Sequence, residues 1–144
     1  MNDAAGDGPR SVVAPPTDPP RRRRHGLIAS FRFAFAGVCY LLRTQRNARI
    51  HVVIGVIACA LAAWLRIPHI DWAILIMTIA GVLILEGLNT ALEAIVDLAS
   101  PEIHPLAKIA KDVAAGMVLI AAIASVGVGL FILGPPLWRW FGHL

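Results

Sequence analysis

The chain has 144 residues, enough for one domain, and 58% of them are hydrophobic while only 15% are charged. A soluble domain of this size needs a polar exterior, so this composition excludes an ordinary soluble protein and favours an integral membrane protein. The formal net charge is +4, and nine of the 13 basic residues precede Ile50, directly ahead of an apolar segment. A nucleic-acid partner is not expected, because no soluble domain with base-reading side chains accompanies these arginines.

Residues 1–25 contain half of the ten prolines and a run of four arginines at 21–24. Such a segment cannot bury enough apolar surface to offset its ordering entropy, so we expect a disordered tail. The positive-inside rule places this basic, proline-rich tail in the cytoplasm, where anionic lipid headgroups would attract it.

The segment 27–43 places Phe31 and Phe35 at helical spacing, with Arg32 and Arg43 elsewhere on the helical wheel. It is short for a membrane span and carries charge. We therefore expect an amphipathic helix that lies in the membrane interface.

Three longer apolar segments follow, at about 50–65, 72–99 and 113–133, each close to the roughly 20 residues that cross a hydrocarbon core. The segment 134–136, Gly-Pro-Pro, is expected to end the last span, and residues 135–144 to form a short interfacial tail. With the amino terminus inside, the turn at 66–71 is outside, the loop at 100–112 inside and the carboxyl terminus outside. The predicted fold is all-α, with one interfacial helix and three transmembrane helices in residues 26–134.

The second span begins with 14 uncharged residues and then carries a polar stripe, Glu86, Asn89, Glu93 and Asp97. Their spacings of three, four and four residues put them on one helix face, within an arc of roughly 80°. A carboxylate inside a bilayer costs about 2.5 to 3.5 kcal/mol, so the stripe must face protein, water or a ligand. The alternative for Glu93 and Asp97 is that the helix has already left the membrane and both are solvated.

The predicted cytoplasmic loop supplies opposite charges in Lys108, Lys111 and Asp112. A lysine can neutralise phosphate, and an adjacent acid can hold it in place. Two carboxylates, an amide and a lysine suit phosphoryl transfer with a divalent metal, although neither common Gly-rich phosphate loop is present. The alternative is that the lysines only flank a span on its cytoplasmic side.

The sequence EGLNTALEAIVD at 86–97, followed by SPEIHPLAKIAKDVAAG at 100–116, resembles the prokaryotic diacylglycerol kinase and undecaprenol kinase family of trimeric membrane enzymes. The resemblance extends from about residue 30 to residue 133. It implies a homotrimer in the bacterial inner membrane that uses Mg²⁺ and ATP. A monomer with three spans would also leave part of the Glu86 stripe facing lipid.

The resemblance implies a role for each matching residue. Glu86 would be the catalytic base that contacts the lipid hydroxyl, with Asn89 in support, and Glu93 would be a Mg²⁺ ligand that also contacts ATP. Gln45 stands where the family commonly has a second metal-binding glutamate, and its amide oxygen can still coordinate Mg²⁺. The other implied nucleotide contacts are Phe33 (often tyrosine in the family), Asp97, Glu102, Ile103, His104, Lys111 and Asp112, and Trp64 matches a lipid-facing position near the far membrane surface.

The sequence thus predicts an ATP-dependent kinase of a membrane lipid alcohol, with undecaprenol and diacylglycerol both open as substrates. The alternative is a non-catalytic scaffold or an ion-conducting oligomer, in which Glu86, Asn89 and Glu93 line a polar pathway.

Overall fold

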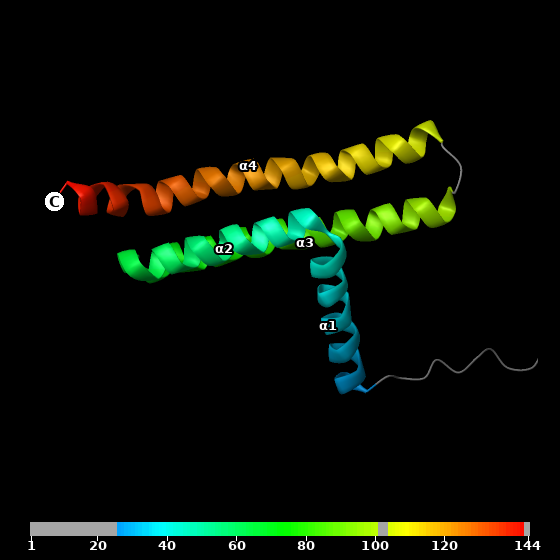
Figure 1. Cartoon of the computed structure of the whole chain (residues 1–144), viewed down its shortest axis with the longest axis horizontal. Coiled ribbons are helices and arrows are strands. Elements are labelled where there is room, and N and C mark those ends of the chain that lie inside the picture. The colour runs from blue at the N-terminus through cyan, green and yellow to red at the C-terminus, as the bar shows by residue number, and fades with distance from the viewer. Residues whose placement is uncertain (1–25, 101–103, 143–144) are drawn as a thin grey trace, which may run out of the picture.

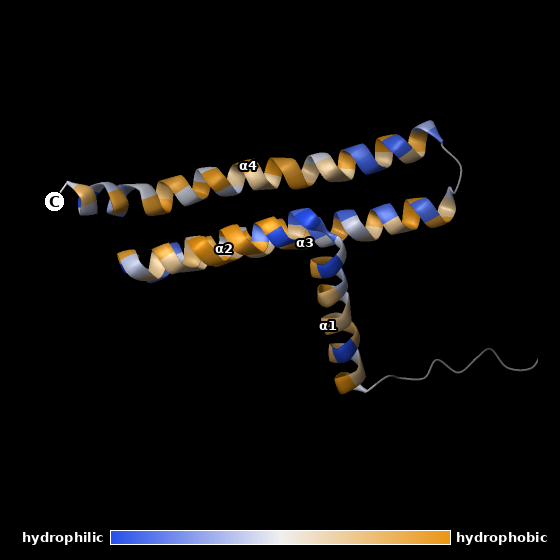
Figure 2. Cartoon of the chain, viewed as in Figure 1, coloured by the Kyte–Doolittle hydropathy of each residue, from blue (hydrophilic) through white to orange (hydrophobic). Residues whose placement is uncertain are grey.

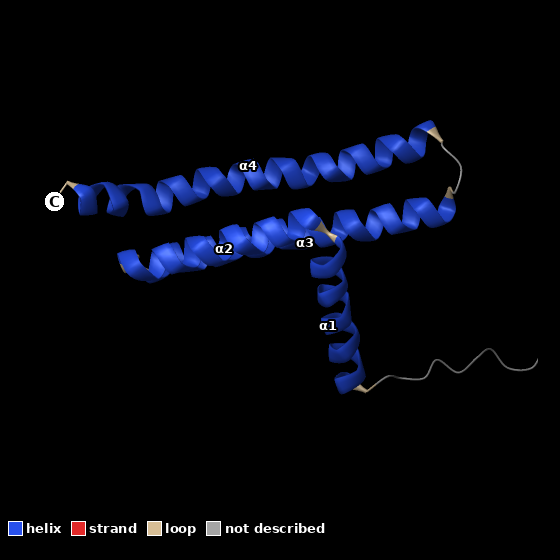
Figure 3. Ribbon diagram, viewed as in Figure 1, coloured by secondary structure: helices blue, strands red, loops and turns tan. Residues whose placement is uncertain are grey.

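The computed structural model describes residues 26–100 and 104–142, and the regular elements in this part of the chain are all helices (Figure 1, Figure 3). They are α1 (Leu27–Thr44), α2 (Arg46–Leu65), α3 (His69–Ala99) and α4 (Pro105–Phe141). Each of these four is long and apolar enough to cross a membrane, which confirms an all-α, multi-pass membrane protein. The predictions for the tail at 1–25 and for Glu102 and Ile103 lie outside the described residues.

Helix α1 matches the segment expected at 27–43 and points away from the other three helices, across their common direction (Figure 1). None of its residues is buried, and Phe31 and Phe35 are both exposed. Its length and composition would also permit a membrane crossing. Its position in the membrane interface therefore stays a prediction.

A single extended residue, Gln45, separates α1 from α2 (φ −97°, ψ 117°) and forms the C-cap of one helix and the N-cap of the other. Its backbone N–H donates to the Leu41 carbonyl at 2.9 Å. Helix α2 therefore begins at Arg46, earlier than the expected residue 50. This junction puts Gln45 beside the amino terminus of α2.

The turn between α2 and α3 is shorter than expected, because α3 begins at His69 rather than at residue 72. Arg66 ends α2 in the left-handed conformation (φ 53°, ψ 49°), which costs a residue with a Cβ more than it costs glycine. Pro68 then forms the N-cap of α3, where a missing N–H loses no helical hydrogen bond.

Helix α4 is much longer than the predicted span at 113–133, and the prediction of a loop through residues 105–112 is wrong. Pro105 occupies the first turn, where its fixed φ favours a helix and its missing N–H costs nothing. His104 caps the helix, since its Nδ1 accepts a hydrogen bond of 3.2 Å from the Leu106 N–H. Local capping signals thus start this helix well before the apolar run.

The prediction that 134–136 ends the helix is also wrong, because α4 continues through Pro135 and Pro136 to Phe141. The position of residues 135–144 in the membrane interface stays a prediction. The two prolines remove donors near the end of the helix but keep a helical φ. Tertiary contact holds the extension, since the Trp140 ring packs against the Trp64 ring with centroids 4.7 Å apart.

The three long helices run side by side, and α2 lies alongside only part of α3 and α4 (Figure 1). Near the α2–α3 turn their core consists of Ala62, Ile67, Leu75 and Leu133. At about 1.5 Å per residue, the 20 residues of α2 measure about 30 Å, the thickness of a hydrocarbon core. Helices α3 (31 residues) and α4 (37 residues) are longer, so they extend past the amino terminus of α2.

Candidate active site

Helix α3 carries two buried polar side chains, Glu86 with 2% of its surface exposed and Asn89 with 9%. In the described part of the chain, these two are the polar residues that are buried. Glu93, one turn further along, is half-buried, and Asp97 is exposed. The stripe therefore runs from the protein interior to an exposed position at Asp97, where the carboxylate pairs with Lys111.

The carboxylate of Glu86 lies at the amino terminus of α2, where it is hydrogen-bonded to the backbone amide of Ala48. Ala48 is the third residue of α2, so its N–H has no acceptor within that helix. The positive end of the helix dipole also favours an anion there. The first turn of α2 thus stabilises a carboxylate that would be costly to expose to lipid.

Glu86 opens onto a cavity of about 320 Å³ between the start of α2 and the facing parts of α3 and α4. Helix α4 contributes an apolar wall, which includes Ala115 and Val118. We call this space the polar cavity, because the following polar side chains line it: Gln45, Asn47, His51, Glu86, Asn89 and Glu93.

Within the polar cavity, the Asn89 Nδ2 group donates a hydrogen bond of 2.9 Å to Oε1 of Glu93. The other end of the same amide, Oδ1, is buried and has no hydrogen-bond partner. An unsatisfied buried acceptor costs about 1 to 3 kcal/mol. Its position suits a ligand that brings a hydroxyl donor or a cation into the cavity.

The described residues contain no group of three or more His, Cys, Asp or Glu side chains spaced to hold a metal ion. Glu93 and Gln45 nevertheless line one cavity and offer carboxylate and amide oxygens, the hard ligands that Mg²⁺ prefers. In nucleotide sites Mg²⁺ uses one or two protein carboxylates and takes its other ligands from phosphates and water. These two residues and the unpartnered Asn89 Oδ1 therefore fit a nucleotide-bound Mg²⁺.

The two lysines of the predicted loop, Lys108 and Lys111, lie on the first turns of α4. Their ion-pair partners are not their neighbours in sequence. Lys111 forms a salt bridge with Asp97 on α3, whereas Asp112 pairs with Lys108 at 2.5 Å. The expectation that Asp112 holds Lys111 is wrong, because successive residues on a helix point about 100° apart.

Three other predicted site residues do not line the polar cavity. His104 is the exposed cap of α4, and Phe33 lies in α1 with the Arg32 guanidinium 5.6 Å from its ring centre. Trp64 lies near the opposite end of α2, against Trp140. Trp64 is exposed at that end, and its contact with the lipid substrate stays a prediction.

Sequence reasoning missed Asn47 and His51, which line the polar cavity from the first turns of α2. The available signal was their spacing, since Asn47 and His51 are four residues apart and share one helix face ahead of the apolar run. Figure 2 shows hydrophilic residues gathered at this end of α2, whereas its other end is mostly apolar.

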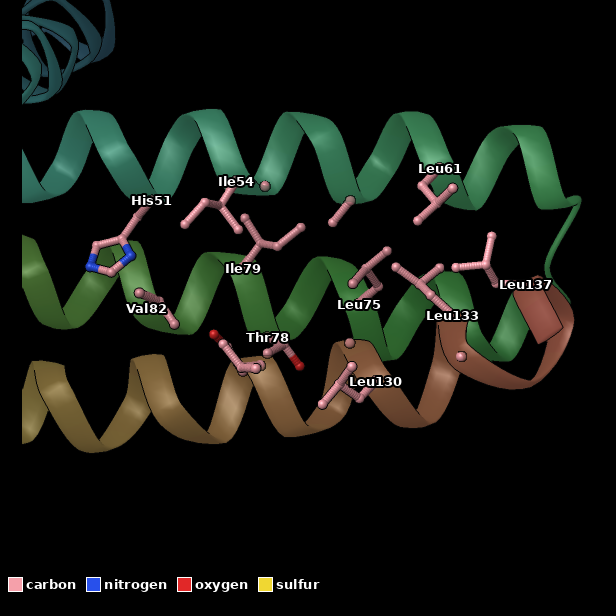
Figure 4. A pocket seen from close by; sticks show the side chains of 16 residues that line it. His51, Ile54, Leu61, Leu75, Thr78, Ile79, Val82, Leu130, Leu133 and Leu137 are labelled. Atoms are coloured by element: carbon pink, nitrogen blue, oxygen red, sulfur yellow. The ribbon is translucent and has the colours of Figure 1, made fainter. Parts of the chain in front are cut away.

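A second cavity of about 330 Å³ continues between α2, α3 and α4 toward the α2–α3 turn (Figure 4). Its lining is almost entirely aliphatic, and we call it the apolar cavity. His51 and Leu137 lie toward its opposite ends (Figure 4). The hydroxyls of Thr78 and Ser125 also line it, and both donate to carbonyls of their own helices.

The chain is thus a helical membrane protein with carboxylates and amides gathered in one cavity. A family model described as prokaryotic diacylglycerol kinase matches residues 32–133. A diacylglycerol kinase of Synechocystis sp. is 54% identical over 112 residues, which cover 77% of this chain and 64% of that protein, just under two thirds of its length.

An undecaprenol kinase of Bacillus subtilis is 40% identical over 117 residues, which cover 81% of this chain and 95% of that protein. A diacylglycerol kinase of Escherichia coli is 38% identical over 86 residues, which cover 60% of this chain and 67% of that protein. The chain therefore belongs to the prokaryotic diacylglycerol kinase family, whose named relatives here are lipid kinases.

Proposed function

We propose that this chain transfers the γ-phosphoryl group of ATP to the hydroxyl of undecaprenol or diacylglycerol, giving undecaprenyl phosphate or phosphatidic acid. The observation that carries the proposal is the polar cavity, where Glu86, Asn89, Glu93 and Gln45 meet beside the start of a membrane span. Phosphoryl transfer needs these functions close together: a positioned acceptor for the hydroxyl proton and hard oxygen ligands for a phosphate-bound metal.

Glu86 is the proposed general base. Its carboxylate would accept the hydroxyl proton as the alcohol oxygen bonds to the γ-phosphorus and the bond from that phosphorus to the β–γ bridging oxygen breaks, releasing ADP. Burial of Glu86 supports this role, because a base shielded from bulk water favours transfer to the lipid over hydrolysis of ATP. Asn89 would hold Glu93 through the hydrogen bond between them.

Glu93 and Gln45 are the residues that we propose for Mg²⁺. When bound, the ion would neutralise charge on the β- and γ-phosphate oxygens and orient them for in-line attack. Gln45 would provide an uncharged ligand, so Glu93 would supply most of the protein's attraction for the ion.

The nucleotide would extend from the polar cavity over the parts of α3 and α4 that project past α2. Lys111 would act on the phosphates, with its ammonium group placed by Asp97. Phe33, Glu102, Ile103, His104 and Asp112 complete the proposed nucleotide contacts on the basis of family resemblance. Because Phe33 lies away from the polar cavity, it would contact the base or ribose rather than the phosphates.

We place the protein in the bacterial cytoplasmic membrane as a homotrimer, with its amino terminus in the cytoplasm and its carboxyl terminus outside. Arg43, Arg46 and Arg49 lie around the α1–α2 junction, at the end of α2 where Glu86 is bound. The positive-inside rule supports a cytoplasmic position for that end. Anionic lipid headgroups would contact the same arginines.

The test is transfer of labelled phosphate from ATP–Mg²⁺ to undecaprenol and to diacylglycerol in mixed micelles, measured side by side on one preparation. We expect a labelled lipid product with at least one alcohol, and the ratio of kcat/KM values identifies the preferred substrate. A purified, ATP-binding protein that labelled neither alcohol would overturn the proposed function.

A further inference from the structure

His51 lies where the two cavities of the bundle meet. Among the described residues that line the polar cavity and the apolar cavity, it is the residue that both share. Figure 4 shows its ring reaching from α2 toward α3 at the end of the apolar cavity. It therefore separates the aliphatic lining from the carboxylates.

The cavities follow one another along the same faces of the three helices. On α3, Val82 lines the apolar cavity and Glu86, one turn further, lines the polar cavity. On α4, Ala122 lines the polar cavity and Val126, again one turn away, lines the apolar cavity. Residues four apart share a helix face, so the lining passes from apolar to polar between Val82 and Glu86 on α3. His51 lines both cavities, so it lies at this same boundary on α2.

The charge distribution at this layer is unusual. Of the residues that line the polar cavity, His51 is the one whose side chain can carry a positive charge, and it interacts electrostatically with Glu86. The nearby Arg46 and Arg49 line a separate surface depression on α2 and do not line the polar cavity. The second carboxylate on α3, Glu93, repels Glu86.

Resting on the proposed function, we infer that His51 is a positioning residue for Glu86, fixing the carboxylate at the boundary between the apolar cavity and the polar cavity. The backbone amide of Ala48 holds the carboxylate by a hydrogen bond, and the imidazole of His51 restrains it by electrostatic attraction. Two restraints leave the base fewer orientations in which it misses the hydroxyl proton. Loss of one restraint should lower the rate of the chemical step without changing how the nucleotide binds.

The experiment compares His51→Leu, which keeps bulk but removes both polar nitrogens, with His51→Gln, which keeps a hydrogen-bonding group. Misplacement by about 1 Å can cost about 100-fold in rate. We expect kcat of His51→Leu to fall by about 10- to 100-fold with an unchanged KM for ATP, and His51→Gln to recover most of that loss. His69→Leu, on an exposed histidine at the far end of α3, is the matched control and should match wild type.

The decisive measurement is a double-mutant cycle with Glu86→Gln. A residue that acts through Glu86 loses its effect once the base is gone, so His51→Leu should lower the residual rate of Glu86→Gln by less than threefold. Each variant must first elute like wild type, which shows that it is folded and assembled. If His51→Leu does not meet this condition, His51→Ala replaces it.

Two outcomes would overturn the inference. One is a His51→Leu kcat within threefold of wild type, and the other is a full multiplicative loss in the Glu86→Gln background, since both require that His51 does not act through Glu86. Failure of the proposed function gives a different result, because the wild-type protein itself would then label no lipid alcohol, and the role of His51 would fall with it.

Discussion

The ammonium group of Lys111 on α4 pairs with the carboxylate of Asp97, 14 residues earlier on α3, although Asp112 is its neighbour in sequence. The pair joins the two helices beyond the end of α2. Both side chains are partly exposed, so the pair is expected to contribute only about 0.2 to 1 kcal/mol to stability. Its main consequence is to fix the place of a cation that we assign to the ATP phosphates.

The first prediction concerns Asp97 as the group that positions Lys111. Asp97→Asn should raise the dissociation constant for ATP–Mg²⁺ by roughly fivefold, the equivalent of about 1 kcal/mol, because Lys111 loses the group that positions it. Asp71→Asn, on an acid in the first turn of α3 that does not line the polar cavity, is the control and should leave that constant within twofold of wild type. Titration calorimetry or equilibrium dialysis measures both. Tighter binding by Asp97→Asn would show instead that the carboxylate competes with the phosphates for Lys111.

The polar stripe of α3 could be read from sequence because it depends on one helix alone. The helical period places Glu86, Asn89 and Glu93 on one face, and their cost in lipid requires burial or a ligand. The position of His51 in the polar cavity could not be predicted from one helix, since it depends on how α2 packs against α3. The same holds for the backbone amide of Ala48, which carries no sequence signal.

The ends of α4 show a similar limit. Gly134 and the prolines that follow are strong local stop signals, yet the helix continues to Phe141, where Trp140 packs against Trp64. Sequence reasoning gives the local signal full weight, whereas the fold adds a tertiary contact that no window of residues contains.

Burial of Glu86 also differs from the expectation. One chain already buries this side chain, so shielding it from lipid does not require a trimer.

The second prediction concerns the close approach of α2 and α3 at Gly55. A Cβ at this position would lie 3.0 Å from Cγ2 of Ile79, so Gly55→Leu should force the helices apart and cost about 1 to 3 kcal/mol. Gly127→Leu is the matched control, because a Cβ there meets nothing within 4 Å. Thermal unfolding in detergent should show a clear loss of Tm for the first variant. Equal Tm values would show that α2 does not pack on α3 at Gly55 in this way.

The third prediction concerns the metal. Gln45→Glu adds a charged oxygen ligand to the polar cavity, so it should lower the Mg²⁺ concentration needed for half-maximal activity. Glu93→Gln removes the charged ligand and should nearly abolish turnover. Rates measured across a Mg²⁺ titration at fixed ATP distinguish the two. An unchanged Mg²⁺ requirement in Gln45→Glu would place position 45 outside the metal shell.

The fourth prediction is a homotrimer, which rests on the family resemblance and on α1, a helix without a buried residue in the single chain. In a trimer, neighbouring copies would cover part of α1, and lipid would cover the rest. Native mass spectrometry in mild detergent should show three chains, and crosslinking in membranes should give a ladder that ends at three. A preparation in which the active species is a monomer would contradict this prediction.

The last prediction separates the proposed base, Glu86, from the proposed phosphate-binding residue, Lys111. Their variants should differ in ATP–Mg²⁺ affinity although both lose turnover. Glu86→Gln keeps the size of the buried side chain and an oxygen that can accept the Ala48 N–H, but it cannot take up the hydroxyl proton. Loss of a general base typically lowers the rate by about 10² to 10⁴-fold, while the affinity for ATP–Mg²⁺ should survive.

Lys111→Ala removes a cation aimed at the phosphates, so both the affinity for ATP–Mg²⁺ and the turnover should fall. Lys108→Ala is the matched control, since Lys108 lies one turn earlier on α4 and pairs with Asp112 rather than with Asp97. Each purified variant is compared by ATP–Mg²⁺ binding and by lipid phosphorylation on the same preparation. If Glu86→Gln kept near-normal turnover while its nucleotide binding collapsed, the buried acid would belong to the nucleotide site, and the base would have to be sought elsewhere.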